Sequence, residues 1–144
     1  MTFELFINFN GNCREALDFY SKVFKAEVKN LMTAGEAPAD PNYPIAEDEK
    51  DLVMYASLKI GDKDIMFMDM DKAHHITIGE NITPTLNVAD RAEIDRLFGE
   101  LKEGGEVLMA PAPAFFSPYY AMVKDKFGII WHILDPTMPT SPEA

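Results

Sequence analysis

An internal repeat constrains the fold of this chain more than any other feature. A helix-capping motif, N-x-x-E or D-x-x-E, is followed by a short E-V pair and then by an apolar terminal segment, and this order of three features occurs twice in the chain. The matched positions are 12–15 with 90–93, 25–28 with 104–107, and 65–69 with 129–133. The two segments of the last pair are separated by fewer residues than those of the other pairs, because only the first copy carries a long acidic loop. The repeat indicates two copies of one folding unit.

Each copy is predicted to run strand, helix and then three strands. Asn12 and Asp90 are good helix N-caps, and each has a glutamate three positions later, as in a capping box. Both predicted helices carry a one-sided apolar stripe, formed by Cys13, Ala16, Leu17, Tyr20, Val23 and Phe24 and by Ile94, Leu97, Phe98 and Leu101. The predicted strands are 3–9, 26–32, 52–60 and 64–70 in the first copy, and 82–88, 106–109, 119–124 and 129–134 in the second.

The fold class predicted from this order is α+β, with two tandem βαβββ modules. One helix leaves one face of each sheet uncovered, and two such sheets can bury these faces by pairing edge to edge around a shared hollow. We therefore expect a curled mixed β-sheet that forms a cup. The expected parts of this single structural domain are a first module at 1–71, a connector at 72–80, a second module at 81–135 and a flexible tail at 136–144.

The loop 33–51 interrupts the first module. It holds three prolines, and six acidic residues against one lysine, Lys50. This composition is typical of a solvated surface loop. Two interpretations stay open: the loop is a lid over a binding site, or it is a passive excursion of the chain.

The composition excludes several classes of partner. The formal net charge is −11, so the chain is not expected to bind nucleic acid or an anionic membrane, whose phosphates it could not neutralise. No apolar run reaches transmembrane length, and no basic leader precedes the first strand. The single cysteine, Cys13, lies in a helical apolar stripe. We interpret it as a structural thiol rather than a nucleophile, in a protein of the reducing cytoplasm.

One histidine stands out in the run D-K-F-G-I-I-W-H-I-L at 125–134. The β-branched residues and the bounding glycine and proline favour a buried strand. His132 is titratable and lies among residues that otherwise belong in a core. It is either an imidazole satisfied by a neighbouring hydroxyl or carbonyl, or a functional group. Trp131 is expected on the opposite face, beneath a helix.

Four motifs together point to a known superfamily. They are Phe9-Asn10-Gly11-Asn12, Ala16-Leu17-Asp18-Phe19-Tyr20, Gly104-Gly105 and Asp125-Lys126-Phe127-Gly128-x-x-Trp131. Over residues 1 to about 135 the chain resembles the vicinal oxygen chelate superfamily, which includes glyoxalase I, fosfomycin and bleomycin resistance proteins and extradiol dioxygenases. More narrowly, it resembles the PhnB-like branch. Some relatives carry an old label as a demethylubiquinone methyltransferase, but this sequence has no Gly-rich nucleotide loop after a strand.

The resemblance implies four inward positions for a divalent metal. In this chain they fall on Leu5, Met68 (Asp69 if the register shifts by one), Thr83 and His132. Because leucine and methionine are poor ligands for Mg²⁺, Mn²⁺ and Zn²⁺, we predict no metal and no other cofactor. The alternative is a divalent metal held by His132 with Asp69 and Glu4, which requires strands to turn their other face inward.

Without a metal, the cup is predicted to be a small-molecule site. Its residues are expected to be apolar on the lining (Leu5, Ile7, Phe9, Met66, Met68 and Ile130), polar at Thr83 and His132, and aromatic at the mouth (Phe115, Phe116, Tyr119 and Tyr120). For the methionines, plain core packing is the alternative to ligand contact.

Two functions are compatible with such a cup. A binding protein would hold a planar or amphiphilic small molecule, as the resemblance to bleomycin-binding proteins implies. An enzyme of the lyase, isomerase or dioxygenase type would use a metal or His132 as general base. The resemblance also implies a homodimer, so the expected partners are a small molecule and a second copy of the chain.

Overall fold

The computed structural model describes residues 1–137, and the chain divides into two compact units between Thr77 and Ile78. This boundary lies inside the predicted connector 72–80. Unit 1 comprises β1 (Phe6–Phe9), α1 (Cys13–Phe24), β2 (Lys29–Thr33), β3 (Val53–Ile60) and β4 (Lys63–Asp69), with two short 3-10 helices, η1 (Ala34–Glu36) and η2 (Glu47–Glu49). Unit 2 comprises β5 (Thr85–Asn87), α2 (Arg91–Leu101), β6 (Glu106–Ala114), β7 (Ser117–Lys124) and β8 (Ile130–Leu134). The predicted tail lies mostly outside the described residues.

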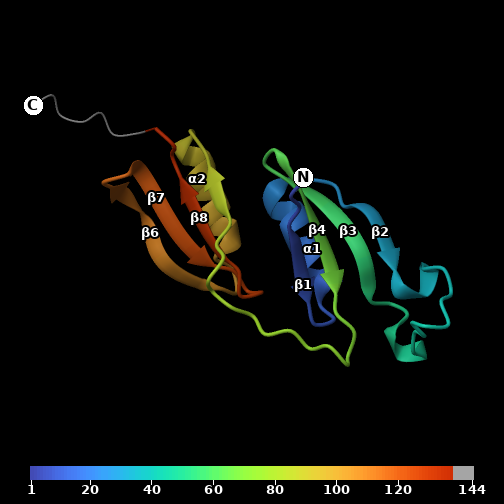
Figure 1. The fold of residues 1–144 in the computed structure, drawn as a ribbon. Coiled ribbons are helices and arrows are strands. Elements are labelled where there is room, and N and C mark those ends of the chain that lie inside the picture. The colour runs from blue at the N-terminus through green and yellow to red at the C-terminus, as the bar shows by residue number, and fades with distance from the viewer. Residues whose placement is uncertain (138–144) are drawn as a thin grey trace, which may run out of the picture. The chain divides into compact units, whose positions relative to one another are not determined.

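Both units build the same four-stranded sheet (Figure 1). The strand order is β1-β4-β3-β2 in unit 1 and β5-β8-β7-β6 in unit 2. In each, the first strand pairs in parallel with the last strand of its unit, and the remaining pairs are antiparallel. The predicted α+β class and the repeated βαβββ module are confirmed.

The helical stripes form the core of each unit. In α1 the buried residues are Cys13, Ala16, Leu17, Tyr20 and Val23, and in α2 they are Ile94, Leu97, Phe98 and Leu101. Each helix packs on one face of its own sheet. Tyr20 meets Phe67 of β4 with ring centroids 5.9 Å apart. Trp131 is 1% exposed and donates from Nε1 to Asp125 Oδ2 (2.9 Å), so its predicted burial is confirmed.

The predicted capping boxes are only half right. Asp90 accepts a hydrogen bond from Ala92 N (3.0 Å), as an N-cap should, and Glu93 pairs with Arg96. Asn12 makes no side-chain cap bond. The first helix is capped by a residue far along the chain, Asp69, whose Oδ1 accepts from Cys13 N (2.9 Å). Tertiary contact replaces the local cap.

Every strand differs from its predicted bounds, and β1 and β2 each begin three residues later than expected. The largest difference is in β6, which was expected to end at Met109 but continues to Ala114 through Pro111 and Pro113. It is the edge strand of its sheet, where a residue without an N–H is tolerated on the solvent side. The strand β5 is shorter than expected and begins only at Thr85. Among the described residues, no helix is long and apolar enough to cross a membrane.

Candidate functional site

The strand register divides the predicted lining of unit 1 between two faces. Ile7 pairs with Phe67 and Phe9 with Asp69, which puts them on the face that α1 covers. The Phe9 and Phe67 rings stack with centroids 6.2 Å apart. Met66 and Met68 lie on the other face. The expectation that Ile7 and Phe9 share a face with these methionines is therefore wrong by one residue, because successive strand side chains alternate.

The residues that do share the open face with the methionines are Phe6 and Asn8, which pair with Met66 and Met68. The Phe6 ring meets Tyr55 of β3 edge to face, with centroids 6.0 Å apart. Leu5, which was also expected in the lining, precedes β1, and its carbonyl oxygen accepts from Met66 N (3.0 Å).

A pocket of about 640 Å³ lies within unit 1, between its sheet and residues 34–52, the acidic segment that connects β2 to β3. Its sheet side is rich in methionine and its other side comes from the acidic segment. The lining residues are Met32, Ala34, Ala37, Pro38, Asp40, Asn42, Tyr43, Pro44, Ile45, Glu49, Leu52, Val53, Met54, Met68, Asp69, Met70 and Asp71. This volume is within the range of small-molecule sites. The acidic segment is therefore a wall of a pocket.

Backbone hydrogen bonds close the base of the acidic segment. Ala34 N donates to Leu52 O and Gly35 N donates to Lys50 O, both at 2.8 Å. At Gly35 a Cβ would lie 3.2 Å from Lys50 O, so the close approach leaves little room for a larger residue. These bonds turn the segment back toward its own sheet, and this return encloses the pocket.

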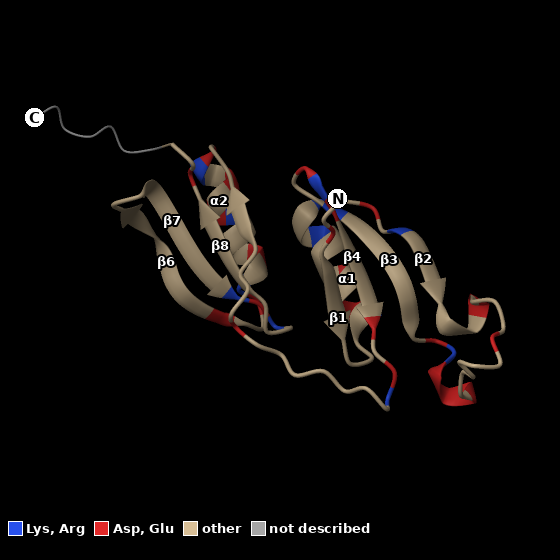
Figure 2. Ribbon diagram, in the orientation of Figure 1, with Lys and Arg blue, Asp and Glu red and all other residues tan. Residues whose placement is uncertain are grey.

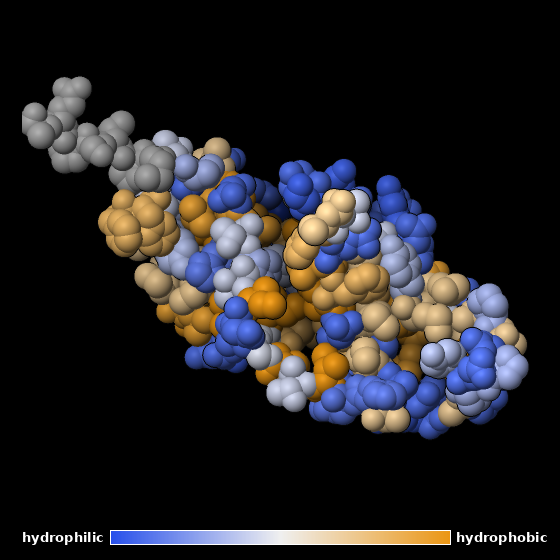
Figure 3. Space-filling model, in the orientation of Figure 1, coloured by the Kyte–Doolittle hydropathy of each residue, from blue (hydrophilic) through white to orange (hydrophobic). Residues whose placement is uncertain are grey.

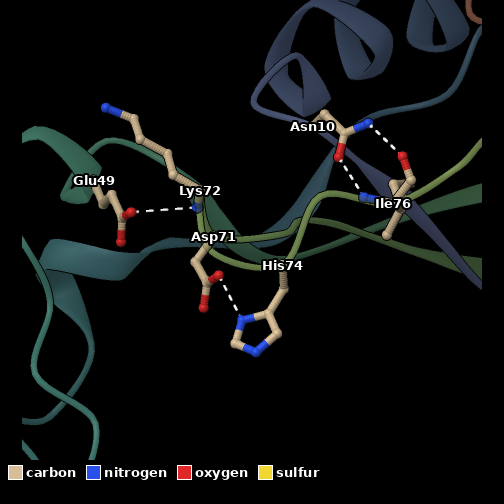
Figure 4. Close-up of polar contacts among 6 residues, drawn as sticks. All are labelled: Asn10, Glu49, Asp71, Lys72, His74 and Ile76. Carbon is tan, nitrogen blue, oxygen red and sulfur yellow. Dashed lines mark hydrogen bonds and ion pairs between the residues drawn. The ribbon is translucent and has the colours of Figure 1, made fainter.

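A second set of contacts holds η2 to the chain that follows β4 (Figure 4). Lys72 N donates to Glu49 Oε1 (3.3 Å), and Lys72 Nζ forms an ion pair with Asp48. This hydrogen-bonded pair lowers the pKa of Asp48 and raises the pKa of Lys72. The Asn10 side chain exchanges two hydrogen bonds with the backbone of Ile76, at 2.9 and 3.1 Å. The predicted connector is thus fastened to both β1 and the acidic segment.

The pocket is acidic. The lining includes four carboxylates, from Asp40, Glu49, Asp69 and Asp71. All three residues of η2 are acidic, and Figure 2 shows this short helix in red. The surface over the acidic segment, at the lower right of Figure 3, is mostly hydrophilic. Asp71 accepts a hydrogen bond from His74 Nδ1 (2.7 Å), and this contact lowers the pKa of Asp71. His74 itself is exposed.

Asp69 does not fit the role of a metal ligand that was kept as an alternative. Its Oδ1 accepts from Gly11 N and Cys13 N and its Oδ2 accepts from Val53 N, at 2.9 to 3.0 Å. Both oxygens are thus bonded to backbone N–H groups of the same unit. Glu4 is exposed and precedes β1. Within residues 1–137, no three histidine, cysteine, aspartate or glutamate side chains gather in a way that could hold a metal ion.

In unit 2, three of the predicted site residues come together. Tyr120 Oη lies 2.9 Å from His132 Nδ1, and the Phe116 ring packs edge to face on Tyr120 with centroids 4.9 Å apart. Burial raises the pKa of Tyr120, so its hydroxyl stays protonated. Ile130, two positions before His132 on β8, lies on the same face. Phe115 contacts Phe116 and is otherwise exposed. The His132 imidazole therefore has a neighbouring hydroxyl as its partner, as expected if its role is structural.

Two predicted residues of unit 2 lie elsewhere. Tyr119 points toward α2, where its hydroxyl donates to Asp95 and Arg91 lies 5.1 Å from its ring centroid. It cannot join Tyr120, since adjacent strand residues face opposite ways. Thr83 precedes β5, and the residue that pairs with His132 is Thr85. Thr83 lies outside the strand because β5 begins two residues later, at Thr85.

Comparisons with known proteins place this geometry in context. Residues 2–134 match the model of a family described as 3-demethylubiquinone-9 3-methyltransferase. Protein YjdN of Escherichia coli K12 is 28% identical over 134 residues, which cover 89% of this chain and 90% of that protein.

Solved structures agree with this match. Protein PA1353 of Pseudomonas aeruginosa is 31% identical with a TM-score of 0.82, covering 94% of this chain and 97% of that one. The PhnB protein of Bacillus cereus is 24% identical with a TM-score of 0.75, covering 93% and 98%. The fosfomycin resistance protein FosX of Listeria monocytogenes is 11% identical with a TM-score of 0.65, covering 95% and 94%. The last two show a shared fold.

Proposed function

The chain belongs to the family described as 3-demethylubiquinone-9 3-methyltransferase, within the PhnB-like branch of the vicinal oxygen chelate superfamily, and on that premise we propose that it binds a small molecule in the pocket beneath the acidic segment. The observation that carries the proposal is the pocket itself. It combines about 640 Å³ of space with an apolar, methionine-rich side and a small number of polar groups. Methionine side chains are flexible and polarizable, so they adapt to ligands of varied shape.

Binding is better supported than the methyl transfer that the family description names. A nucleotide-type methyl donor is commonly held by a Gly-rich loop between a strand and a helix. The β1–α1 connection is Asn10-Gly11-Asn12 and the β5–α2 connection is Val88-Ala89-Asp90. Neither described connection has that composition.

The positions that the superfamily uses for its metal do not fit one here. Leu5 and Met68 lack oxygen or nitrogen donors, Asp69 is engaged by three backbone N–H groups, and Thr83 precedes its strand. The proposed binding therefore involves no step through a metal.

A pocket-filling substitution tests the proposal. Ala37 lines the pocket, whereas Ala39, two residues on, is exposed and does not. N-phenyl-1-naphthylamine, a neutral dye that fluoresces in apolar sites, is expected to bind the unmodified protein. The variant Ala37→Trp should weaken this binding about tenfold or more, because a new indole occupies the space that the dye needs. The matched variant Ala39→Trp should bind as before. If the dye does not bind the unmodified protein, or if both variants bind it equally well, the proposal fails.

The contact between Tyr120 and His132 favours a second candidate, an enzyme that uses His132 in acid–base chemistry. The hydrogen bond orients the imidazole, which a general acid or base requires. His132 does not line the pocket. The substitution His132→Gln should therefore leave dye binding unchanged under the first proposal. A loss of dye binding in this variant would place the binding site at His132 and contradict the first proposal. The homodimer and the cytoplasmic location stay predictions from the resemblance and from the single cysteine.

A further inference from the structure

The charge of the pocket narrows the class of ligand, given the proposed function on which this inference rests. We propose that the pocket takes an organic cation, an ammonium ion attached to an apolar body. The cavity provides the space for a ligand, and the carboxylates that line it favour a positively charged one.

The carboxylates of the lining are only partly engaged by other groups of the protein. Asp40 Oδ1 accepts from Asn42 N (2.9 Å), Glu49 Oε1 from Lys72 N (3.3 Å) and Asp71 Oδ1 from His74 Nδ1 (2.7 Å). At Asp40 and Glu49 these contacts use one of the two oxygens, whereas the Asp71 carboxylate also meets the backbone N–H groups of Ala73 and His74. Asp69 differs, since both of its oxygens are bonded to backbone N–H groups. Asp40 and Glu49 are thus the residues with an oxygen left to face a ligand's charge.

No lysine, arginine or histidine lines the pocket, all of whose lining residues lie in the described part of the chain. The lysines nearest in sequence have acidic partners of their own. Lys50 pairs with Glu47, and Lys72 pairs with Asp48. A cleft lined by one sign of charge beside low-dielectric walls concentrates its potential, so the pocket attracts cations and repels anions.

The remaining lining fits an apolar body rather than a bare metal ion. Methionine thioethers and the side chains of Ile45, Leu52 and Val53 offer apolar contact. Tyr43 lines the pocket and is 76% exposed, so its ring face is available for a cation–π contact with an ammonium group. An amphiphilic cation uses both kinds of surface at once.

Three compounds that differ in one group test the inference. They are 4-(trimethylammoniomethyl)benzyl alcohol, its neutral isostere 4-neopentylbenzyl alcohol, and the anion 4-(sulfomethyl)benzyl alcohol. Their dissociation constants are measured by calorimetry and by displacement of N-phenyl-1-naphthylamine. At low ionic strength the cation is expected to bind about tenfold more tightly than the isostere, since two or three partly exposed charges act on it. This preference should shrink as sodium chloride is added.

Two double variants test whether the lining carboxylates cause the preference for the cation over its neutral isostere. The double variant Asp40→Asn and Glu49→Gln keeps an oxygen that can accept each local hydrogen bond but removes two charges from the lining, so it should reduce the preference to about threefold or less. The control Asp51→Asn and Asp64→Asn removes two exposed charges outside the lining and should keep it.

The outcomes separate this inference from the proposed function. Equal binding of the cation and the isostere, tightest binding of the anion, or a preference lost only in the control variant would overturn the cationic ligand while small-molecule binding stands. Failure of the dye and of all three compounds to bind would overturn both.

Discussion

Asp69 shows how one buried carboxylate organises unit 1. It is 7% exposed and accepts three hydrogen bonds, which join the end of β4 to the start of α1 and the start of β3. It also lines the pocket. An N–H group in the first turn of a helix has no partner within that helix. A carboxylate there accepts its hydrogen bond, and the negative charge interacts favourably with the helix dipole. One residue thus fixes a helix, a hairpin and one wall of the candidate site.

The substitution Asp69→Asn should cost about 2–4 kcal/mol of unfolding free energy. An amide has one acceptor oxygen where the carboxylate has two, so at least one buried N–H loses its partner. Urea denaturation followed by circular dichroism measures the loss. Asp64→Asn, at an exposed position of the same strand, is the control and should stay within about 0.5 kcal/mol of the unmodified protein. Equal stability of the two variants would contradict the capping role.

Cys13 gives a prediction that depends on pH. Burial, assisted by the negative charge of Asp69, raises the pKa of this thiol from 9.0 to about 12. Between these values the thiol is ionised only in the unfolded chain, which binds fewer protons, so stability falls as the pH rises. The stability difference between the unmodified protein and Cys13→Ala should therefore narrow by about 1.4 kcal/mol between pH 7 and pH 10. A constant difference in urea denaturation would show that the folded thiol titrates normally.

At the scale of elements, local patterns predicted the helices, while the side-chain orientation of β1 depended on pairing. The stripe of α1 has a clear helical period, and its buried residues lie where that period puts them. In β1, Phe6 and Ile7 are both apolar, so the alternation does not say which of them faces the helix. The choice is made by pairing with β4, which aligns Ile7 with Phe67.

The same limit applies to β6 and to the pocket. Pro111 and Pro113 are locally typical of a loop. They are tolerated because β6 lies at the edge of its sheet, and this position depends on the strand order rather than on the local sequence. The acidic segment and the methionines of β4 were both visible in the sequence. What could not be read there is the return of the segment onto its own sheet, which depends on contacts such as Gly35 with Lys50.

Lys72 is expected to hold the acidic segment closed. The substitution Lys72→Gln removes the ion pair with Asp48 but keeps the backbone donor to Glu49. A glutamate-specific protease should then cleave after Glu47 or Glu49 about twofold to fivefold faster, as expected for the loss of one exposed ion pair. The excess should vanish in 1 M salt, which screens the pair. Lys63→Gln, whose ion pair is with Asp62 in the β3–β4 turn, is the control. Unchanged cleavage in Lys72→Gln would mean that the ion pair does not secure the segment.

At the scale of the whole molecule, the chain consists of two units that share one topology and differ in their connections. Unit 1 carries the acidic segment and a pocket beneath it, whereas the equivalent connection in unit 2, from β6 to β7, is a short turn at Phe115 and Phe116. The terminal strands also differ. Met68 in β4 occupies the position that His132 holds in β8, so an apolar contact in one unit corresponds to a hydrogen-bonded imidazole in the other. Ligand binding in unit 1 and the aromatic and imidazole cluster of unit 2 are separable by experiment.

The methyl groups of methionine provide the most direct test that the pocket binds a small molecule. The chain has nine methionines, and four of them line the pocket: Met32, Met54, Met68 and Met70. With carbon-13 in the methionine methyl groups, titration with N-phenyl-1-naphthylamine is followed by nuclear magnetic resonance, and Met→Leu variants assign the signals. These four signals should shift together along one binding curve, while those of Met109 and Met122, in unit 2, stay in place. Shifts confined to Met109 and Met122, with the four pocket methionines unmoved, would contradict binding in the pocket.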